Sequence, residues 1–208
     1  MTDTWSRAAS ALRPPTPDAP ARFTVHFEQD KARLDFRDAQ STCWGHDSRE
    51  AWTSRNAQRD YTHVRHAARA VPMLKWFAAM PHKLLDPGVQ AQRVGLSSSA
   101  GPQVLVQFGT HDNRTGDRML ATFRPHDGGL VKLAYTARAF GEHVMGLAEF
   151  VSWEIVEGVR LPAEVSVSLL SPVPLNLAQH LQFKGWALAE VAADYFEKPP
   201  DPPSASED

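Results

Sequence analysis

The sequence predicts an α+β protein, in which a curved antiparallel β-sheet forms an unclosed half-barrel wrapped around one apolar helix. Many short segments alternate between apolar and polar residues, as strands with one buried face do. Short turns separate most of these segments, which favours antiparallel neighbours. One segment, residues 71–85, is instead apolar on almost every side.

The alternating segments define the expected strands. They are centred on residues 23–27, 34–36, 104–108, 119–123, 133–135, 147–155, 165–169 and 181–188. Turn-forming residues separate several of them, at 29–30, 126–129 and 157–158. The order predicts a largely meandering sheet.

The apolar segment 71–85 predicts the enclosed helix. Pro72 suits the first turn of a helix, and Pro81 should end or kink it. A helix that is apolar all round has to be enclosed. A curved sheet with the helix in its concavity satisfies that demand, whereas a flat two-layer sandwich would leave one side of the helix in water.

The two ends of the chain differ from this body. Trp5, Ala8, Ala9 and Leu12 have helical spacing, so residues 1–20 are expected to form a short helix and a Pro-rich linker. Residues 21–198 are expected to form a single half-barrel domain. Residues 199–208 lack large apolar side chains and are expected to be a disordered tail.

Composition excludes several classes of protein. The chain has 208 residues and a formal net charge of −2, so no basic field indicates a nucleic-acid partner. A single cysteine excludes an internal disulfide. The sequence has no run of about eighteen apolar residues, so no transmembrane segment is predicted. The start has no secretory leader, which predicts a cytoplasmic protein as written, or a periplasmic one if a leader was removed or the start is misplaced.

Two hairpin sequences resemble those of the bacterial outer-membrane lipoprotein carriers. The stretch GHDSREAW over 45–52 precedes the apolar helix, and the stretch WEIVEGVRLP over 153–162 resembles the family's hairpin with Gly-Val-x-Leu-Pro. Phe196, followed closely by proline, ends the similarity, which covers about 21–199. The resemblance implies a half-barrel of antiparallel strands around helices, with a concave apolar pocket for acyl chains or lipoproteins.

The leading functional prediction is non-catalytic binding or carriage of a hydrophobic ligand, either an acyl chain, a lipid or a lipid-modified polypeptide. An incompletely closed sheet tends to leave a cleft lined by apolar side chains. No cofactor, metal site or catalytic residue is predicted. The predicted ligand-contacting residues are Trp44, Trp52, Met73, Trp76, Phe77, Met80, Phe108, Phe123, Tyr135 and Trp153.

Two other functions stay open. The first is a small hydrolase or isomerase that uses the histidines and aspartates of the dipeptides 46–47 and 111–112; we favour turn formation for these and for 126–127. His63 and His66 would share a helix face but lack further ligands, and Cys43 is expected to be a buried, inert thiol. The second is a protein-interaction module that adds a partner strand to an exposed sheet edge.

Overall fold

The protein folds into two compact units, each built on its own antiparallel sheet. The structure, a computed structural model, describes residues 21–98, 101–107, 118–136, 144–171, 175–192 and 194–201. One unit contains Phe77–Leu188, and the other contains the described residues before 77 and after 188. Where the alternation predicts one sheet over 21–198, the structure has two.

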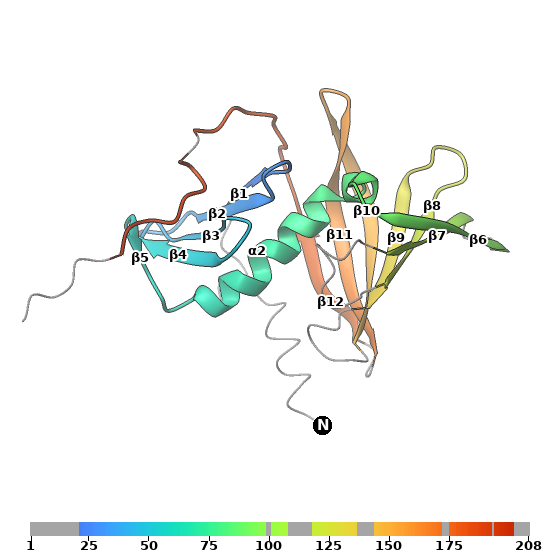
Figure 1. The fold of residues 1–208 in the computed structure, drawn as a ribbon, viewed down its shortest axis with the longest axis horizontal. Coiled ribbons are helices and arrows are strands. Elements are labelled where there is room, and N and C mark those ends of the chain that lie inside the picture. The colour runs from blue at the N-terminus through green and yellow to red at the C-terminus, as the bar shows by residue number, and fades with distance from the viewer. Residues whose placement is uncertain are drawn as a thin grey trace, which may run out of the picture. The chain divides into compact units, whose positions relative to one another are not determined.

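The first unit contains a five-stranded sheet in the order β1-β2-β3-β4-β5, with each strand antiparallel to the next (Figure 1). Tight turns join these strands, so each pairs with its neighbour in the sequence. The strands are β1 (Ala21–His26), β2 (Lys31–Phe36), β3 (Cys43–His46), β4 (Ala51–Arg55) and β5 (Gln58–Arg59).

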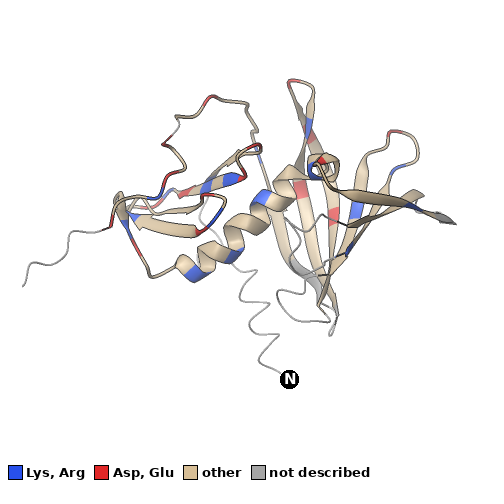
Figure 2. Ribbon diagram, viewed as in Figure 1, with Lys and Arg blue, Asp and Glu red and all other residues tan. Residues whose placement is uncertain are grey.

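Helix α2 (Val64–Ala79) follows β5, and its first half covers one face of this sheet. Ala67, Ala70 and Val71 of the helix form one core cluster with residues of the sheet that include Leu34 and Trp44. The helix carries basic residues and no acidic ones (Figure 2).

The helix differs in extent from the predicted segment 71–85. It begins at Val64, so Pro72 lies in its interior instead of its first turn. Small residues before Pro72 pack on the sheet, and this burial extends the helix toward its N-terminus. The helix ends before Pro81, as predicted. Residues His82–Leu85 form a separate 3-10 helix, η1, in which Leu85 is 84% exposed.

The second unit contains a seven-stranded sheet in the order β12-β11-β10-β9-β8-β7-β6. It is an antiparallel meander whose first and last strands are not paired with each other, so the sheet is unclosed. The strands are β6 (Gln90–Ser98), β7 (Gly101–Gln107), β8 (Arg118–Phe123), β9 (Leu130–Thr136), β10 (Met145–Val156), β11 (Val159–Ser171) and β12 (Leu175–Gln182).

The predicted architecture is confirmed at the level of class, since the described part of the chain is mostly antiparallel sheet with one α-helix and two unclosed sheets. Strands β5 and β6 were not predicted from the sequence, and β3 and β4 are not among the alternating segments. The last strand ends at Gln182, before the predicted 183–188, because Gly185 has a positive φ of 69° and takes the chain out of the extended conformation.

Both predicted ends lie partly outside the described residues. The expected helix and linker over 1–20 are outside them, as are residues 202–208 of the expected tail. Residues 199–201 are described and contact the five-stranded sheet: the Pro200 carbonyl accepts a hydrogen bond from the Arg59 backbone N–H, and Asp201 pairs with the Arg59 side chain.

Candidate functional site

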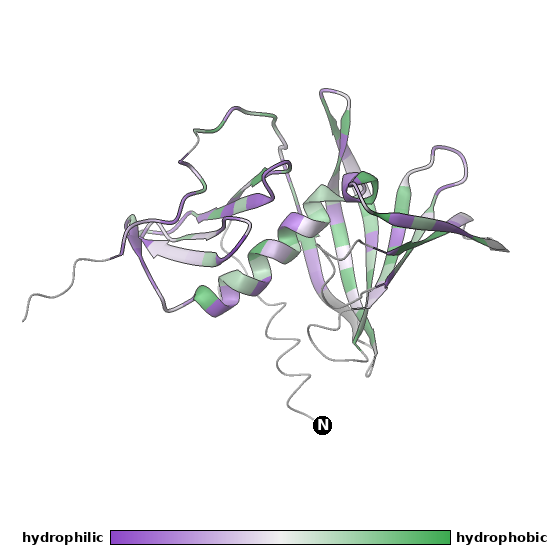
Figure 3. Ribbon diagram, in the orientation of Figure 1, coloured by the Kyte–Doolittle hydropathy of each residue, from purple (hydrophilic) through white to green (hydrophobic). Residues whose placement is uncertain are grey.

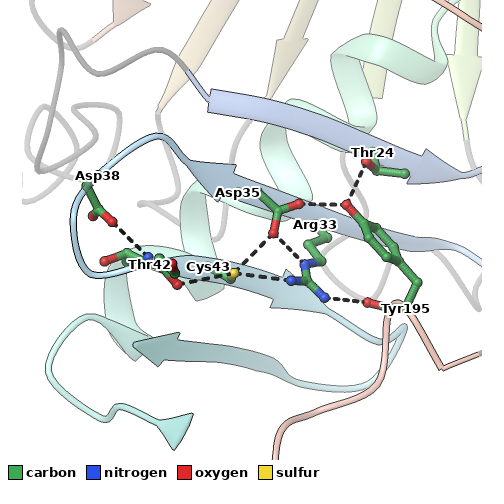
Figure 4. A network of polar contacts seen from close by, with 8 residues as sticks. Thr24, Arg33, Asp35, Asp38, Thr42, Cys43 and Tyr195 are labelled. Atoms are coloured by element: carbon green, nitrogen blue, oxygen red, sulfur yellow. Dashed lines mark hydrogen bonds and ion pairs between the residues drawn. The ribbon is translucent and has the colours of Figure 1, made fainter. Parts of the chain in front are cut away.

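A polar network lies on the face of the five-stranded sheet that is opposite to α2 (Figure 4). Arg33 and Asp35 alternate on β2 with the buried residues Ala32 and Leu34, so they point to this second face. The Arg33 Nε donates to Asp35 Oδ1 at 2.8 Å, and its Nη2 donates to the Cys43 Sγ at 3.2 Å. The Cys43 thiol in turn donates to Asp35 Oδ1 at 3.0 Å.

The C-terminal segment completes this network through Tyr195. The Tyr195 hydroxyl donates to Asp35 Oδ2 at 2.6 Å and lies 3.2 Å from the Thr24 hydroxyl. Its backbone carbonyl accepts from Arg33 Nη1 at 2.8 Å, and the guanidinium lies 4.5 Å from the centre of its ring. The network therefore attaches residues near the end of the chain to the second and third strands.

Cys43 is buried and free, as predicted. Burial is the main cause that raises the pKa of its thiol, and the hydrogen bond to Asp35 raises it further. A nucleophilic cysteine needs the opposite shift, because the thiolate is the reactive form. Both terminal nitrogens of Arg33 are engaged, one by the Cys43 Sγ and the other by the Tyr195 carbonyl, and we interpret the network as structural.

The second unit presents a continuous apolar face. Directly paired residues of antiparallel strands lie on the same side of a sheet, so the register defines which side chains share this face. Figure 3 shows hydrophobic and hydrophilic residues following one another along the strands of this sheet. Arg93 and Gln179, on the two edge strands, pair with Val104 and Val167 and lie on the same side. We call the apolar members of this side the apolar face: Val104, Val106, Met119, Ala121, Leu133, Tyr135, Gly146, Ala148, Val165, Val167 and Leu181.

The opposite side of the same sheet is mixed, because a row of mainly apolar paired residues crosses it beside a polar one. The mainly apolar row contains Leu105, Leu120, Ala134, Leu147 and Ser168. The polar row crosses five strands: Thr122, Lys132, Glu149, Ser166 and His180. Within it, the Lys132 ammonium lies 2.6 Å from the Glu149 carboxylate. Polar side chains are thus concentrated on one side of the seven-stranded sheet, although that side also carries leucines.

Tyr135 of the apolar face packs against Phe77 of helix α2. The Phe77 and Tyr135 rings meet edge to face, with their centres 6.3 Å apart. Gly146 makes room for the Tyr135 ring, because a Cβ there would lie 2.4 Å from Tyr135 Cζ. Phe77 and Met80 are fully buried, and burial raises the pKa of Tyr135.

The predicted ligand-contacting residues are divided between the two units. The five-stranded unit holds Trp44, Trp52, Met73 and Trp76, whereas the other holds Phe77, Met80, Phe123, Tyr135 and Trp153. Phe108 lies outside the described residues.

The two tryptophans of the five-stranded unit do not line one pocket. Trp44 pairs with Thr53 and Trp52 pairs with Gly45, so successive positions place the two indoles on opposite faces of the sheet. Trp44 belongs to the core under α2, and both side chains are buried. Met73 and Trp76 are half-buried on the helix.

The histidine–aspartate dipeptides that the structure describes act in turns. Asp47 accepts hydrogen bonds from the backbone N–H groups of Arg49 and Glu50, and Asp127 accepts one from Gly129. His111 and Asp112 lie outside the described residues. Among the described residues, no group of three or more His, Cys, Asp or Glu side chains could hold a metal ion, and His63 and His66 have no further ligand beside them.

A serine–histidine–glutamate group, which was not predicted from the sequence, lies on the side of the seven-stranded sheet opposite to the apolar face. Ser166 Oγ lies 3.3 Å from His180 Nδ1, and His180 Nε2 lies 3.2 Å from Glu164 Oε1. Acyl transfer would also need donors for an oxyanion. Strand β11 lies between β10 and β12, so its backbone N–H groups are directed at those strands. We interpret the group as cross-strand pairing.

Comparisons of the chain with protein-family models, with curated proteins and with solved structures give no match. In the part of the chain that the structure describes, no helix is long and apolar enough to cross a membrane.

Proposed function

We propose that the protein binds the acyl chain of an amphiphile, without catalysis, along the apolar face of the seven-stranded sheet. The observation that carries the proposal is two rows of paired apolar residues that cross this face, one from Val104 to Val167 and one from Val106 to Leu169, in a sheet that does not close. A small closed barrel is filled by side chains or encloses one small ligand, whereas an unclosed sheet also leaves an open edge where a longer chain can enter.

The partly buried residues are the ones that offer surface to such a ligand. Phe77 and Met80 are already covered, so they support the face without needing to contact the chain. Phe123 follows Ala121 of this face by two positions on β8. Trp153 stacks on Phe150, which pairs with Val165 of the face. Both residues, Phe123 and Trp153, are like Tyr135 half-buried and still expose aromatic surface. Burying apolar ligand surface against them contributes about 25 cal/mol per Å².

We further propose that the seven-stranded sheet curves around Phe77 and Met80, at the end of α2. This curvature would give the ligand a concave surface. The resemblance of residues 45–52 and 153–162 to the lipoprotein carriers supports a lipid or a lipid-modified polypeptide as the natural cargo. Release would follow from movement of the helix end or of an edge strand.

Titration with a fluorescent polyene fatty acid tests this function. We expect saturable binding of one probe per chain, displaced by lauric acid. Phe123→Ala should weaken binding about fivefold, because removing one partly buried aromatic side chain costs about 1 kcal/mol of apolar contact.

Phe27→Ala is the matched control, since Phe27 is an exposed phenylalanine in the other unit. Its affinity should equal that of the unmodified protein. The absence of saturable binding for every fatty acid and lysophospholipid tried would refute the proposed function. Equal weakening by both substitutions would move the site away from the apolar face.

A further inference from the structure

Two arginines lie side by side at one end of the seven-stranded sheet. Arg124 opens the turn between β8 and β9, and Arg160 is in β11, just after the β10–β11 turn. Both pair with one carboxylate: Arg124 Nε lies 3.2 Å from Asp127 Oδ1, and Arg160 Nη1 lies 3.4 Å from Asp127 Oδ2.

Gly129 allows the two guanidinium groups to come together. A Cβ at this position would lie 2.8 Å from Arg124 Nη2 and 2.9 Å from Arg160 Nη1. Both groups therefore lie over the Gly129 backbone. The turn itself is fixed, because the Arg124 N–H donates to the Gly129 carbonyl at 2.8 Å and the Gly129 N–H donates to Asp127 at 3.0 Å.

The cluster of Arg124, Arg160 and Asp127 has an unbalanced charge, and one of its arginine nitrogens has no hydrogen bond. Among the residues that the structure describes, Asp127 is the one carboxylate paired with these arginines, and it compensates one of the two guanidinium charges. Asp127 is ionised at neutral pH, because the hydrogen bond from Gly129 and the nearby arginines lower its pKa. The Arg124 Nε is shielded from solvent, yet its contact with Asp127 is an ion pair without hydrogen-bond geometry. His126 adds positive charge beside the group when it is protonated.

We infer that Arg124 and Arg160 bind the anionic oxygen group, carboxylate or phosphate, of the amphiphile whose chain lies on the apolar face. Paired guanidinium groups match the geometry of such oxyanions. The apolar residues Phe123 and Leu130 pair with each other and adjoin Arg124 and Gly129 in the chain, so the charged group and apolar side chains are one residue apart. The inference rests on the proposed function for the binding of the ligand's acyl chain, and on the two arginines for the binding of its head group.

Comparing ligands with the same chain and different heads tests the head-group site at pH 7.5. Lauric acid should bind about tenfold more tightly than dodecanol, since a charge-assisted hydrogen bond is worth about that factor. The double substitution Arg124→Gln with Arg160→Gln should abolish the preference. Arg118→Gln, which alters an exposed arginine at the other end of β8, should leave it unchanged.

The substitution Asp127→Asn tests the same site through an expected gain in affinity for the acid. Asparagine keeps the acceptor for the Gly129 N–H and removes the competing charge, so the acid should bind more tightly while dodecanol should not change. A misfolded variant would not produce this result. Titration with inorganic phosphate alone, followed by calorimetry, reports the same site without a chain.

The outcomes separate the two proposals. Equal affinity for acid and alcohol, or a preference that survives the double substitution, overturns the head-group site and leaves chain binding standing. Phosphate binding that depends on both arginines, without binding of either chain, refutes the proposed function and retains an anion site for free phosphate. Failure of both the chains and phosphate to bind overturns both.

Discussion

Gly45 is required by the position of a single neighbouring side chain. A Cβ at this position would lie 2.1 Å from two atoms of the Trp52 indole, which is 1% exposed. We predict that Gly45→Ala lowers the free energy of unfolding by about 1–3 kcal/mol, the usual cost of overpacking. Urea denaturation measures the change.

A second substitution distinguishes crowding from a general loss of backbone freedom. The Trp52 indole N–H has no hydrogen-bond partner, so Trp52→Phe removes bulk without breaking a hydrogen bond. Gly45→Ala should therefore cost less in the Trp52→Phe background. An equal cost in both backgrounds would show that the indole is not the obstacle.

His46 makes the stability of the five-stranded unit depend on pH. Its pKa is lowered from the ordinary 6.5, chiefly by burial and then by the nearby Lys75 charge, while Asp30 and Asp47 act in the opposite direction. The unfolded chain therefore takes up the proton first as the pH falls. Stability contributed by neutral His46 is complete above pH 6.5 and is lost below it.

We predict that His46→Gln reduces the fall in the free energy of unfolding between pH 7.5 and pH 5.5, measured by urea denaturation at both values. The control is His126→Gln, because that side chain is 74% exposed. The aspartates with lowered pKa values lose their contribution at lower pH, nearer 4. An unchanged fall in the His46 variant would contradict the assignment.

At the scale of the elements, the C-terminal segment makes the contacts that were hardest to predict from the sequence. Tyr195 donates to Asp35 from more than 150 positions away, and nothing in its neighbourhood of charged residues and prolines predicts that contact. Phe196 is buried beside it, with its ring centre 6.1 Å from that of His26. The segment is fastened by side chains and not by strand pairing, so it has no periodic signal.

We predict that Tyr195→Phe lowers the free energy of unfolding by about 1–2 kcal/mol, because it leaves a partly buried carboxylate with one donor fewer. Tyr61→Phe also removes a hydroxyl that donates to an aspartate, but Tyr61 is 59% exposed. Its cost should be much smaller than that of Tyr195→Phe, because water replaces the lost hydrogen bond. Chemical denaturation of the two variants gives the comparison, and equal costs would refute the role assigned to the buried hydroxyl.

At the scale of the whole molecule, alternation predicted most strands because each needs only a local pattern with a period of two. It did not indicate that α2 divides them into two sheets. The start of the helix depends on Ala67 and Ala70, small residues whose burial only the tertiary structure reveals. The paired arginines were missed for a similar reason: Arg124 and Arg160 lie on different hairpins, and Gly129 between them resembles any turn glycine.

The chain therefore forms its five-stranded unit from two distant stretches, with the seven-stranded unit between them in sequence. We predict that a chain ending at Ala192 loses hydrogen-exchange protection in β2, β3 and β5, while β8–β11 keep theirs. Arg33 and Asp35 would lose Tyr195, and the Arg59 N–H would lose the Pro200 carbonyl. Exchange measured by mass spectrometry resolves the two sheets, because protection follows local stability. Equal acceleration in both sheets would mean that the two units unfold as one and that the C-terminal segment stabilises the whole protein.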